Sequence, residues 1–388
     1  MKNIVLSGRK IVMGTGALSF LKELKYDKAL IVTGGSSMIR TGVIKEATDY
    51  LEHKGGEVKV HSGVASDPTI EEVMRGVAVM KEFKPQAVIA IGGGSTMDCA
   101  KAMLLFYEFP MLTFENVLEI NARGEIPKGR KTELICVPST SGTGSEVTRG
   151  TVITDLEKQL KVPIMTDCLR PDIAILDGRL PMTMPKNIVA ETGMDALTHA
   201  MEAYINHNLD EFDEALCSGA ITGIMKWLPV SYRKENEEEM LAAREKVHYY
   251  QAMAGIGFAN VGLGMVHGIA HSFGAVFHMA HGLTNAIILP YALAYNRRNS
   301  EVENKLRELS YRCRCNDIVE EIKELAKQLN IPSSIAGAGV EEKDFLEKYD
   351  ILTDHAMLGA TRVNPVPIDM DTMEKLIKAV YYGTDINF

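Results

Sequence analysis

The sequence lacks any apolar run long enough to cross a lipid bilayer. Its longer apolar stretches, such as 87–91 and 286–289, are far shorter than the roughly 20 residues that a membrane-spanning helix requires. The first ten residues also lack the apolar segment and the small-residue cleavage site of a secretory signal. We therefore expect a cytoplasmic chain that is neither inserted in a membrane nor exported.

Paired cysteines and clustered basic charge are missing as well. The six cysteines are scattered, and only Cys313 and Cys315 lie close together, at a spacing that suits a zinc site poorly. The formal net charge is −9, with no basic stripe to meet a phosphate backbone. We expect free cysteines in a reducing compartment and no nucleic-acid partner.

The chain, 388 residues long, is longer than one hydrophobic core usually serves. In the first half, apolar β-branched runs predict strands at 29–33, 58–60, 87–91, 134–137 and 173–176, with helices at 43–53 and 70–83. After Pro185 the pattern becomes helical, in long stretches at 188–205, 212–227, 237–259 and 302–329. The sequence thus predicts an α/β domain over 1–185 and an all-α domain over 186–388.

Two glycine-rich segments follow predicted strands. Gly92–Ser95 precedes a helix-compatible stretch, where main-chain N–H groups and the helix dipole favour a phosphate. The turn matches neither strict nucleotide signature, so an ordinary tight turn is an equal alternative. The second segment, 138–146, carries five hydroxyl groups and two glycines, and it can also be read as a polar loop that caps a helix. Together the two segments predict a dinucleotide site.

The turn after the first predicted strand contains Gly34, Gly35, Ser36 and Ser37, with Arg40 nearby. Enzymes that use NAD commonly place a carboxylate here against the ribose 2′-hydroxyl, and this loop has none. The sequence therefore favours NADP(H) over NAD(H). Alternatively, the small residues only allow the strand and the next helix to pack closely.

Histidines cluster in the second half, at His267, His271, His278 and His281. On one straight helix the first and last would lie roughly 21 Å apart, whereas ligands of one metal each lie about 2 Å from it. If both bind one ion, the chain must break between them, at Gly274 or in the stretch approaching Gly282.

A second cluster precedes these histidines. Asp195 and His199 are four residues apart, which places both on one helical face as a chelating pair, with Glu202 as a possible third member. Spacing alone does not select the later ligands, because His267 with His271 serves as well as His267 with His281.

The chain resembles the iron-containing (group III) alcohol dehydrogenases over nearly its whole length. Four segments carry the resemblance: GGGSTMDCAKA from Gly92, PSTSGTGSEVT from Pro138, GMDALTHAMEAY from Gly193, and residues 267–290. It implies a Rossmann-like N-terminal domain, a helical C-terminal domain of the dehydroquinate synthase-like fold, an active site in the cleft between them, and a homodimer.

The resemblance also implies site residues. The ligands of an Fe²⁺ or Zn²⁺ ion would be Asp195, His199, His267 and His281. The turn at 93–95 would bind the cofactor diphosphate, and Thr140, Thr143, Lys161 and Leu180 match other cofactor contacts of the family. The whole predicted cofactor site is Gly34, Gly35, Ser36, Ser37, Gly93, Gly94, Ser95, Asp98, Ser139, Thr140, Thr143, Lys161 and Leu180.

These observations predict a metal-dependent enzyme that interconverts a small primary alcohol and its aldehyde with NADP(H). The alternatives are an NAD-dependent diol, glycerol or lactaldehyde oxidoreductase and, further away, a non-catalytic subunit that binds nucleotide and metal. His271, one turn from His267, either relays a proton or is a buried structural histidine. Phe258 and Phe277 suggest a small aliphatic pocket, or else belong to the core.

Overall fold

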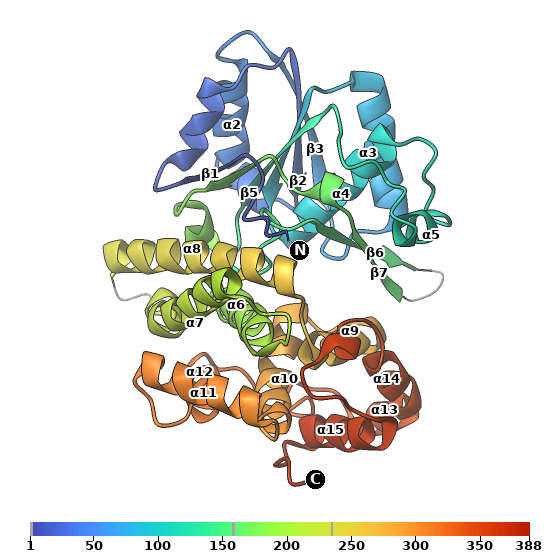
Figure 1. The fold of residues 1–388 in the computed structure, drawn as a ribbon. Helices are drawn as coiled ribbons and strands as arrows, with labels where there is room; N and C mark the ends of the chain where they lie inside the picture. The colour runs from blue at the N-terminus through green and yellow to red at the C-terminus, as the bar shows by residue number, and fades with distance from the viewer. Residues whose placement is uncertain (1–2, 157–159, 234–235) are drawn as a thin grey trace. The chain divides into compact units, whose positions relative to one another are not determined.

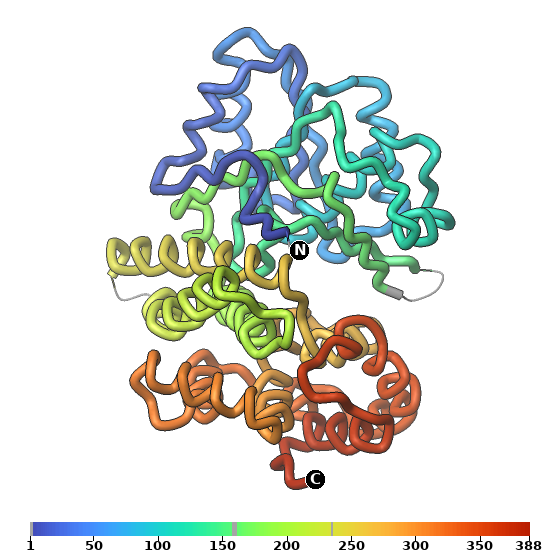
Figure 2. The backbone as a smooth tube through the Cα atoms, viewed as in Figure 1, coloured from blue at the N-terminus to red at the C-terminus, as the bar shows by residue number. Residues whose placement is uncertain are grey.

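The structure is a computed structural model that describes residues 3–156, 160–233 and 236–388. The chain forms two compact units, Met1–Met184 and Pro185–Phe388. The path of each can be followed by colour in Figure 2, from blue to green in the first unit and from green to red in the second. None of the six cysteines forms a disulfide, as the sequence predicts.

The first unit is built on a six-stranded parallel sheet (Figure 1). In spatial order its strands are β1 (Lys10–Met13), β8 (Ile173–Leu176), β5 (Glu133–Pro138), β4 (Ala87–Gly92), β2 (Lys28–Gly34) and β3 (Glu57–Val64). All five predicted strands are present. β1 was missed because it is an edge strand of four residues, only half-buried at its two central positions, and so has no continuous apolar run.

Both faces of this sheet are covered, which is typical of parallel sheets whose strands are apolar throughout. Alternate strand residues such as Leu30 and Val88 pack against α3 (Ile70–Phe83), α4 (Gly94–Glu108) and α5 (Val117–Ala122). On the opposite face, residues such as Ile31 and Ile89 pack against η1 (Ala17–Glu23), α1 (Ser37–Arg40) and α2 (Val43–Glu52). The carboxyl ends of the strands therefore carry the turns that enter these helices.

An antiparallel hairpin, absent from the sequence-based prediction, follows β5. Its strands are β6 (Gly150–Asp155) and β7 (Leu160–Met165). β6 packs against α4, and η2 (Asp167–Leu169) and η3 (Leu180–Thr183) complete the unit.

The described residues of the second unit form helices and no strand. Its elements are α6 (Lys186–Ile205), α7 (Glu211–Tyr232), α8 (Glu237–Val261), α9 (Met265–Phe277), α10 (His281–Asn296), α11 (Ser300–Cys313), α12 (Ile318–Gln328), α13 (Glu342–Glu347), α14 (Tyr349–Ala356), η4 (Gly359–Val363) and α15 (Met370–Tyr382). The predicted fold class, α/β followed by all-α, is confirmed.

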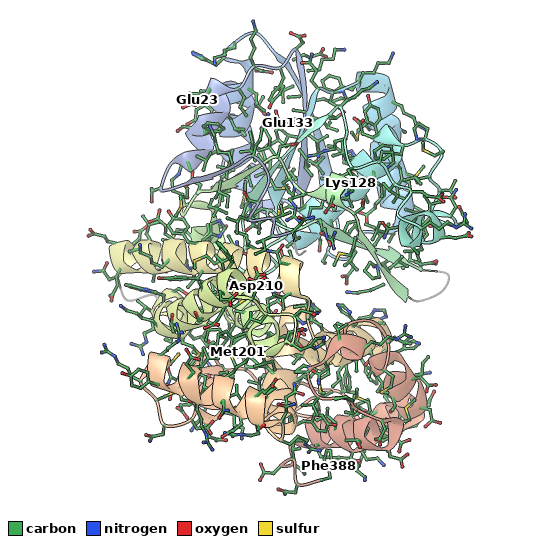
Figure 3. All side chains as sticks on the ribbon, viewed as in Figure 1. Glu23, Lys128, Glu133, Met201, Asp210 and Phe388 are labelled. Carbon is green, nitrogen blue, oxygen red and sulfur yellow. The ribbon has the colours of Figure 1, made fainter. Side chains whose placement is uncertain are left out.

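Helix α6 is the central element of this unit. It packs against α7, α8 and α10, and every residue of 193–205 is buried, including Met201, which Figure 3 labels. Polar side chains on this stretch therefore lie out of water, where each needs a hydrogen-bond partner or an ion to offset its desolvation.

Two helix breaks define the second half of the unit. α9 ends at Phe277, His278 takes the left-handed conformation (φ 54°), and α10 begins at His281. The break thus falls in the later of the two predicted places, and Gly274 stays inside α9. The predicted helical stretch 302–329 is not continuous, because Arg314 (φ 59°) ends α11 and the Asp317 side chain caps α12.

Within the described part of the chain, no single helix is both long and apolar enough to span a membrane. Helices α8 and α9 meet the length and composition criteria only as a pair, with a bend of 103° between them.

Candidate metal centre and cofactor loops

Three helices of the second unit bring the four predicted ligands together. Asp195 and His199 lie on one buried face of α6, while His267 lies in the first turn of α9 and His281 begins α10. One donor atom from each residue can be chosen so that all four lie within 4.8 Å of one another. The break between α9 and α10 makes this possible, because it turns His281 back towards His267.

The spacing of the histidines left His271 and His281 as equal candidates, and the structure groups His281 with the others. Its Nε2 lies 3.7 Å from Oδ1 of Asp195. The ring of His271 stacks on that of His281 at 5.2 Å and meets the ring of His267 edge-on at 6.0 Å. His271 is therefore half-buried, and its ring contacts two of the four predicted ligands without being one of the converging donors.

The donor set fits a divalent cation. Burial lowers the pKa of His267 well below its usual value, and the neighbouring histidines lower it further, which keeps its imidazole neutral. Nδ2 of Asn285 donates to Oδ1 of Asp195 at 2.7 Å and lies 3.1 Å and 3.2 Å from Nε2 of His281 and His267. Three acceptor atoms thus converge on one point. Nδ1 of His199 is buried without a hydrogen-bond partner among the described residues.

One carboxylate and three imidazoles suit Fe²⁺ and Zn²⁺ alike. A cation among these atoms would satisfy lone pairs that otherwise compete for a single amide group. The residues present therefore fit the ion that the sequence predicts.

Glu202, considered above as a possible third ligand of α6, lies behind His267 instead. Its Oε2 is 2.5 Å from Nδ1 of His267, and its Oε1 accepts the main-chain N–H of Val266 at 2.7 Å. Burial raises the pKa of Glu202 to about 8, and the main-chain N–H groups at the start of α9 act in the opposite direction. Glu202 therefore contacts a predicted ligand and is not one of the four converging donors.

Of the two aromatic residues predicted to line a pocket, Phe258 contacts one of the predicted metal ligands. The ring of Phe258 stacks on His199 at 4.5 Å and 20°. Phe277, at the end of α9, has its ring contact with buried Phe273. Asn285 was missed, although its spacing of four from His281 repeats the spacing of Asp195 and His199 and could have revealed it.

The two glycine-rich segments of the first unit lie against each other. The N–H of Ser139 donates to the carbonyl of Gly92 at 2.8 Å. A Cβ atom at Gly94 would lie 2.6 Å from Cγ2 of Thr143, and one at Gly93 would lie 3.4 Å from Oγ1 of Thr140. No side chain caps the N-terminus of α4, so its first N–H groups and the hydroxyls of this loop form a site suited to an anion.

A buried lysine joins these segments, and sequence reasoning missed it. Lys101 on α4 is 0% exposed, and its ammonium donates to the carbonyls of Ser145, Thr148 and Gly150 at 2.7, 3.1 and 2.8 Å. Asp98, one turn earlier, accepts from the Ser145 hydroxyl and from the N–H of Val152, both at 3.1 Å. Burial raises the pKa of Asp98. Both residues bind the loop, and a contact between Asp98 and the cofactor stays a prediction.

The loop after β2 separates into a packed glycine and an exposed part. A Cβ atom at Gly34 would lie 2.8 Å from Oγ1 of Thr96. A side chain at this position would therefore meet α4, whereas the alternative interpretation concerned close packing against the next helix, α1. Ser36, Ser37 and Arg40 are exposed, as is Gly35, and they remain available to a ligand.

The contacts of Lys161 and Leu180, the two remaining predicted cofactor residues, are with other parts of the first unit. Nζ of Lys161, on β7, pairs with Oδ1 of Asp67 at 2.7 Å. Leu180 is 1% exposed and packs in the apolar core beneath the sheet, so its side chain presents no open surface to a ligand.

Comparison with known proteins assigns the family. The profile described as iron-containing alcohol dehydrogenase matches residues 8–178, and the C-terminal profile of the Fe-containing alcohol dehydrogenase family matches 189–381. The chain belongs to the iron-containing alcohol dehydrogenase family. The predicted family and enzyme class are thereby confirmed, and the chain is an oxidoreductase, a metal-dependent alcohol dehydrogenase.

Relatives in the iron-containing alcohol dehydrogenase family match over almost the whole chain. An NADPH-dependent butanol dehydrogenase of Clostridium saccharobutylicum is 40% identical over 98% of both chains. An alcohol dehydrogenase of Thermococcus barophilus is 36% identical over 96% of this chain and 98% of its own. The solved iron-containing alcohol dehydrogenase of Thermococcus thioreducens superposes with a TM-score of 0.90 at 34% identity, covering 98% of this chain and 100% of its own.

Proposed function

We propose that this alcohol dehydrogenase interconverts short primary alcohols and aldehydes with NADP(H), using an ion held by Asp195, His199, His267 and His281. The observation that carries the proposal is the convergence of these four donors, within 4.8 Å of one another, from three separate helices. The relative that is named an NADPH-dependent butanol dehydrogenase supports both the substrate class and the cofactor. The alternative of a diol or lactaldehyde oxidoreductase has less support from the named relatives.

When bound, a divalent ion supplies a Lewis acid that polarises a carbonyl oxygen or favours ionisation of a hydroxyl group. Asp195 and the three imidazoles hold that ion, as Fe²⁺ or Zn²⁺. Phe258 covers one face of His199 and excludes water there. His271, half-buried and stacked on His281, is in a position to exchange a proton with bulk water.

The cofactor is proposed to bind the first unit through its diphosphate. The N-terminus of α4 at Gly93 and Gly94 supplies N–H donors and the positive end of a helix dipole. Thr140 and Thr143 present half-buried side chains beside that turn. The exposed guanidinium of Arg40 suits the 2′-phosphate of NADP(H), since an arginine near this strand end commonly accommodates that group.

Family membership also supports a cytoplasmic homodimer, and the −9 net charge disfavours a nucleic-acid or anionic membrane partner. Size-exclusion chromatography with light scattering measures the proposed dimer directly.

The test is a comparison of NADPH and NADH oxidation across short aliphatic aldehydes, on protein whose metal content has been measured. We expect NADPH to be preferred. The Arg40→Ala variant should raise KM for NADPH and leave KM for NADH unchanged, whereas Lys45→Ala, at another exposed position beyond the same loop, should change neither. Equal or better use of NADH by the wild type would overturn the cofactor assignment. Metal-loaded protein that reduces no aldehyde with either cofactor would overturn the proposed substrate class.

His271 has its own test in the pH profile of turnover. A relay predicts that His271→Ala lowers kcat and removes a limb of the profile near neutral pH. Full turnover with an unchanged profile would assign His271 to packing.

A further inference from the structure

Glu202 is a buried carboxylate whose partners all come from the start of a different helix. It lies three residues after His199 on α6 and is 3% exposed. Such a group is costly to bury unless hydrogen bonds or charges replace its water. Its Oε1 accepts the N–H of Val266 at 2.7 Å, and its Oε2 lies 2.5 Å from Nδ1 of His267.

The N-cap residue of α9 has no side chain that could accept the first main-chain N–H groups of the helix. Its N-cap residue is Gly264, and a Cβ atom there would lie 3.0 Å from Oε1 of Glu202. The Glu202 carboxyl group therefore shares the role of a capping side chain with Asn364, whose Oδ1 accepts the N–H of Met265 at 3.2 Å. One group thus holds both the main chain and the ring of His267. Because it engages Nδ1, it directs Nε2, which lies 3.2 Å from Nδ2 of Asn285, towards the point where the predicted ligands converge.

Asn285 makes the corresponding connection from α10. It lies one turn after His281 and is 0% exposed. Its Nδ2 donates to Oδ1 of Asp195 at 2.7 Å, which joins α10 to α6. The same amide group lies 3.1 Å from Nε2 of His281, so it spans ligands from two helices.

We propose that Glu202 and Asn285 are positioning residues that hold α6, α9 and α10 in the ion-binding arrangement before the ion arrives. The inference rests on the proposed metal centre. Each residue ties a ligand of one helix to a second helix, Glu202 between α6 and α9 and Asn285 between α10 and α6. With both in place, the ion meets oriented donors. Without them, binding has to order the ligands and offset that entropic cost.

The experiment titrates metal-free protein with Co²⁺ alone and follows the visible absorption bands, which report affinity and coordination geometry. Glu202→Gln keeps the shape of the side chain and replaces one carboxyl oxygen by an amide group, and Asn285→Leu keeps the volume and removes the donor. The matched control is Glu191→Gln, at a half-buried glutamate of the same α6 whose carboxyl interacts with Asn187.

We expect Co²⁺ binding about ten- to a hundredfold weaker in both variants, the usual effect of losing a partner of a metal ligand. Their absorption spectra should also change, whereas the control should match the wild type. A role confined to stability would lower the melting temperature and leave the spectrum of the loaded protein unaltered, which contradicts the inference.

Two outcomes separate this inference from the proposed function. Wild-type affinity and spectrum in both variants would refute the positioning role and leave the metal centre standing. A wild-type protein that binds no Co²⁺ would refute the metal centre, and the inference with it. If Glu202→Gln does not fold, as judged by circular dichroism of the metal-free protein, the Asn285→Leu variant alone tests the inference through the contact between α10 and α6.

Discussion

Replacing the buried lysine of α4 by methionine tests how the cofactor loop is held. In Lys101→Met the side chain keeps its length and loses its charge, so the carbonyls of Ser145, Thr148 and Gly150 lose their donor. A buried acceptor left without a partner costs about 1–3 kcal/mol, and removing one member of a buried charged network costs about 3–5 kcal/mol.

Burial lowers the pKa of Lys101, and Asp98 acts in the opposite direction. Desolvation of the ammonium is therefore a real cost in the wild type, and methionine relieves it. We accordingly expect the lower end of the range, about 3 kcal/mol of lost unfolding free energy, out of the roughly 5–15 kcal/mol that domains usually have.

Two assays follow from this estimate. Denaturant unfolding measures the stability loss, with Lys45→Met as the control, because that lysine is exposed and its pair with Asp49 is worth less than about 1 kcal/mol. NADPH binding to metal-free protein, read by cofactor fluorescence, should weaken at least tenfold in Lys101→Met because the loop at 139–145 loses its anchor. Wild-type stability together with wild-type NADPH affinity would refute the reasoning.

Three further perturbations test other parts of the structure. Asp177 is 0% exposed and accepts from the N–H groups of Gly16 and Leu18 and from Arg179, which together hold its pKa below the usual range. Since a depressed folded pKa contributes stability that is lost on acidification, Asp177→Asn should cost about 2–3 kcal/mol at pH 7. In denaturant titrations that difference should shrink below about pH 4, and a constant one would contradict the assignment. Gly94→Ala should weaken NADPH binding about tenfold, because overpacking costs about 1–3 kcal/mol and its Cβ would lie 2.6 Å from Thr143. Gly129→Ala, outside the predicted cofactor site and with nothing within 4 Å, should have no effect, and equal behaviour of the two would exclude the packing argument. Removal of the metal with a chelator should lower the melting temperature by several degrees, because an ion at a hundred times its Kd stabilises the folded state by about 2.7 kcal/mol; an unchanged melting curve would show that no ion was bound.

The parts of the fold that were predictable are those in which the local pattern and the tertiary environment agree. β4 is buried along its whole length and runs directly into a glycine turn, so its apolar run and its end are both visible in the sequence. The helix α3 has apolar residues at helical spacing and a capping box at Thr69. By contrast, the hairpin of β6 and β7 depends on contacts with α4 that no local pattern encodes.

In the candidate site, too, the parts set by local pattern were predictable and the parts set by tertiary packing were not. The pair Asp195 and His199 follows from helical spacing alone. The choice of His281 over His271 depends on the break at His278, and the sequence offered two places for that break without deciding between them. The contacts of Glu202 and Asn285 could not be predicted, although the spacing of each along its helix marks it as a candidate. Their partners lie on other helices, so only the packing of three helices defines what they do.

The most direct test of the central claim is anomalous diffraction at the iron edge, from crystals of protein loaded anaerobically with Fe²⁺. The account predicts one strong peak per chain, within bonding distance of Asp195, His199, His267 and His281. It further predicts that this peak disappears in the His267→Ala protein. A peak elsewhere, or no peak in crystals of protein that still reduces aldehydes with NADPH, would contradict it.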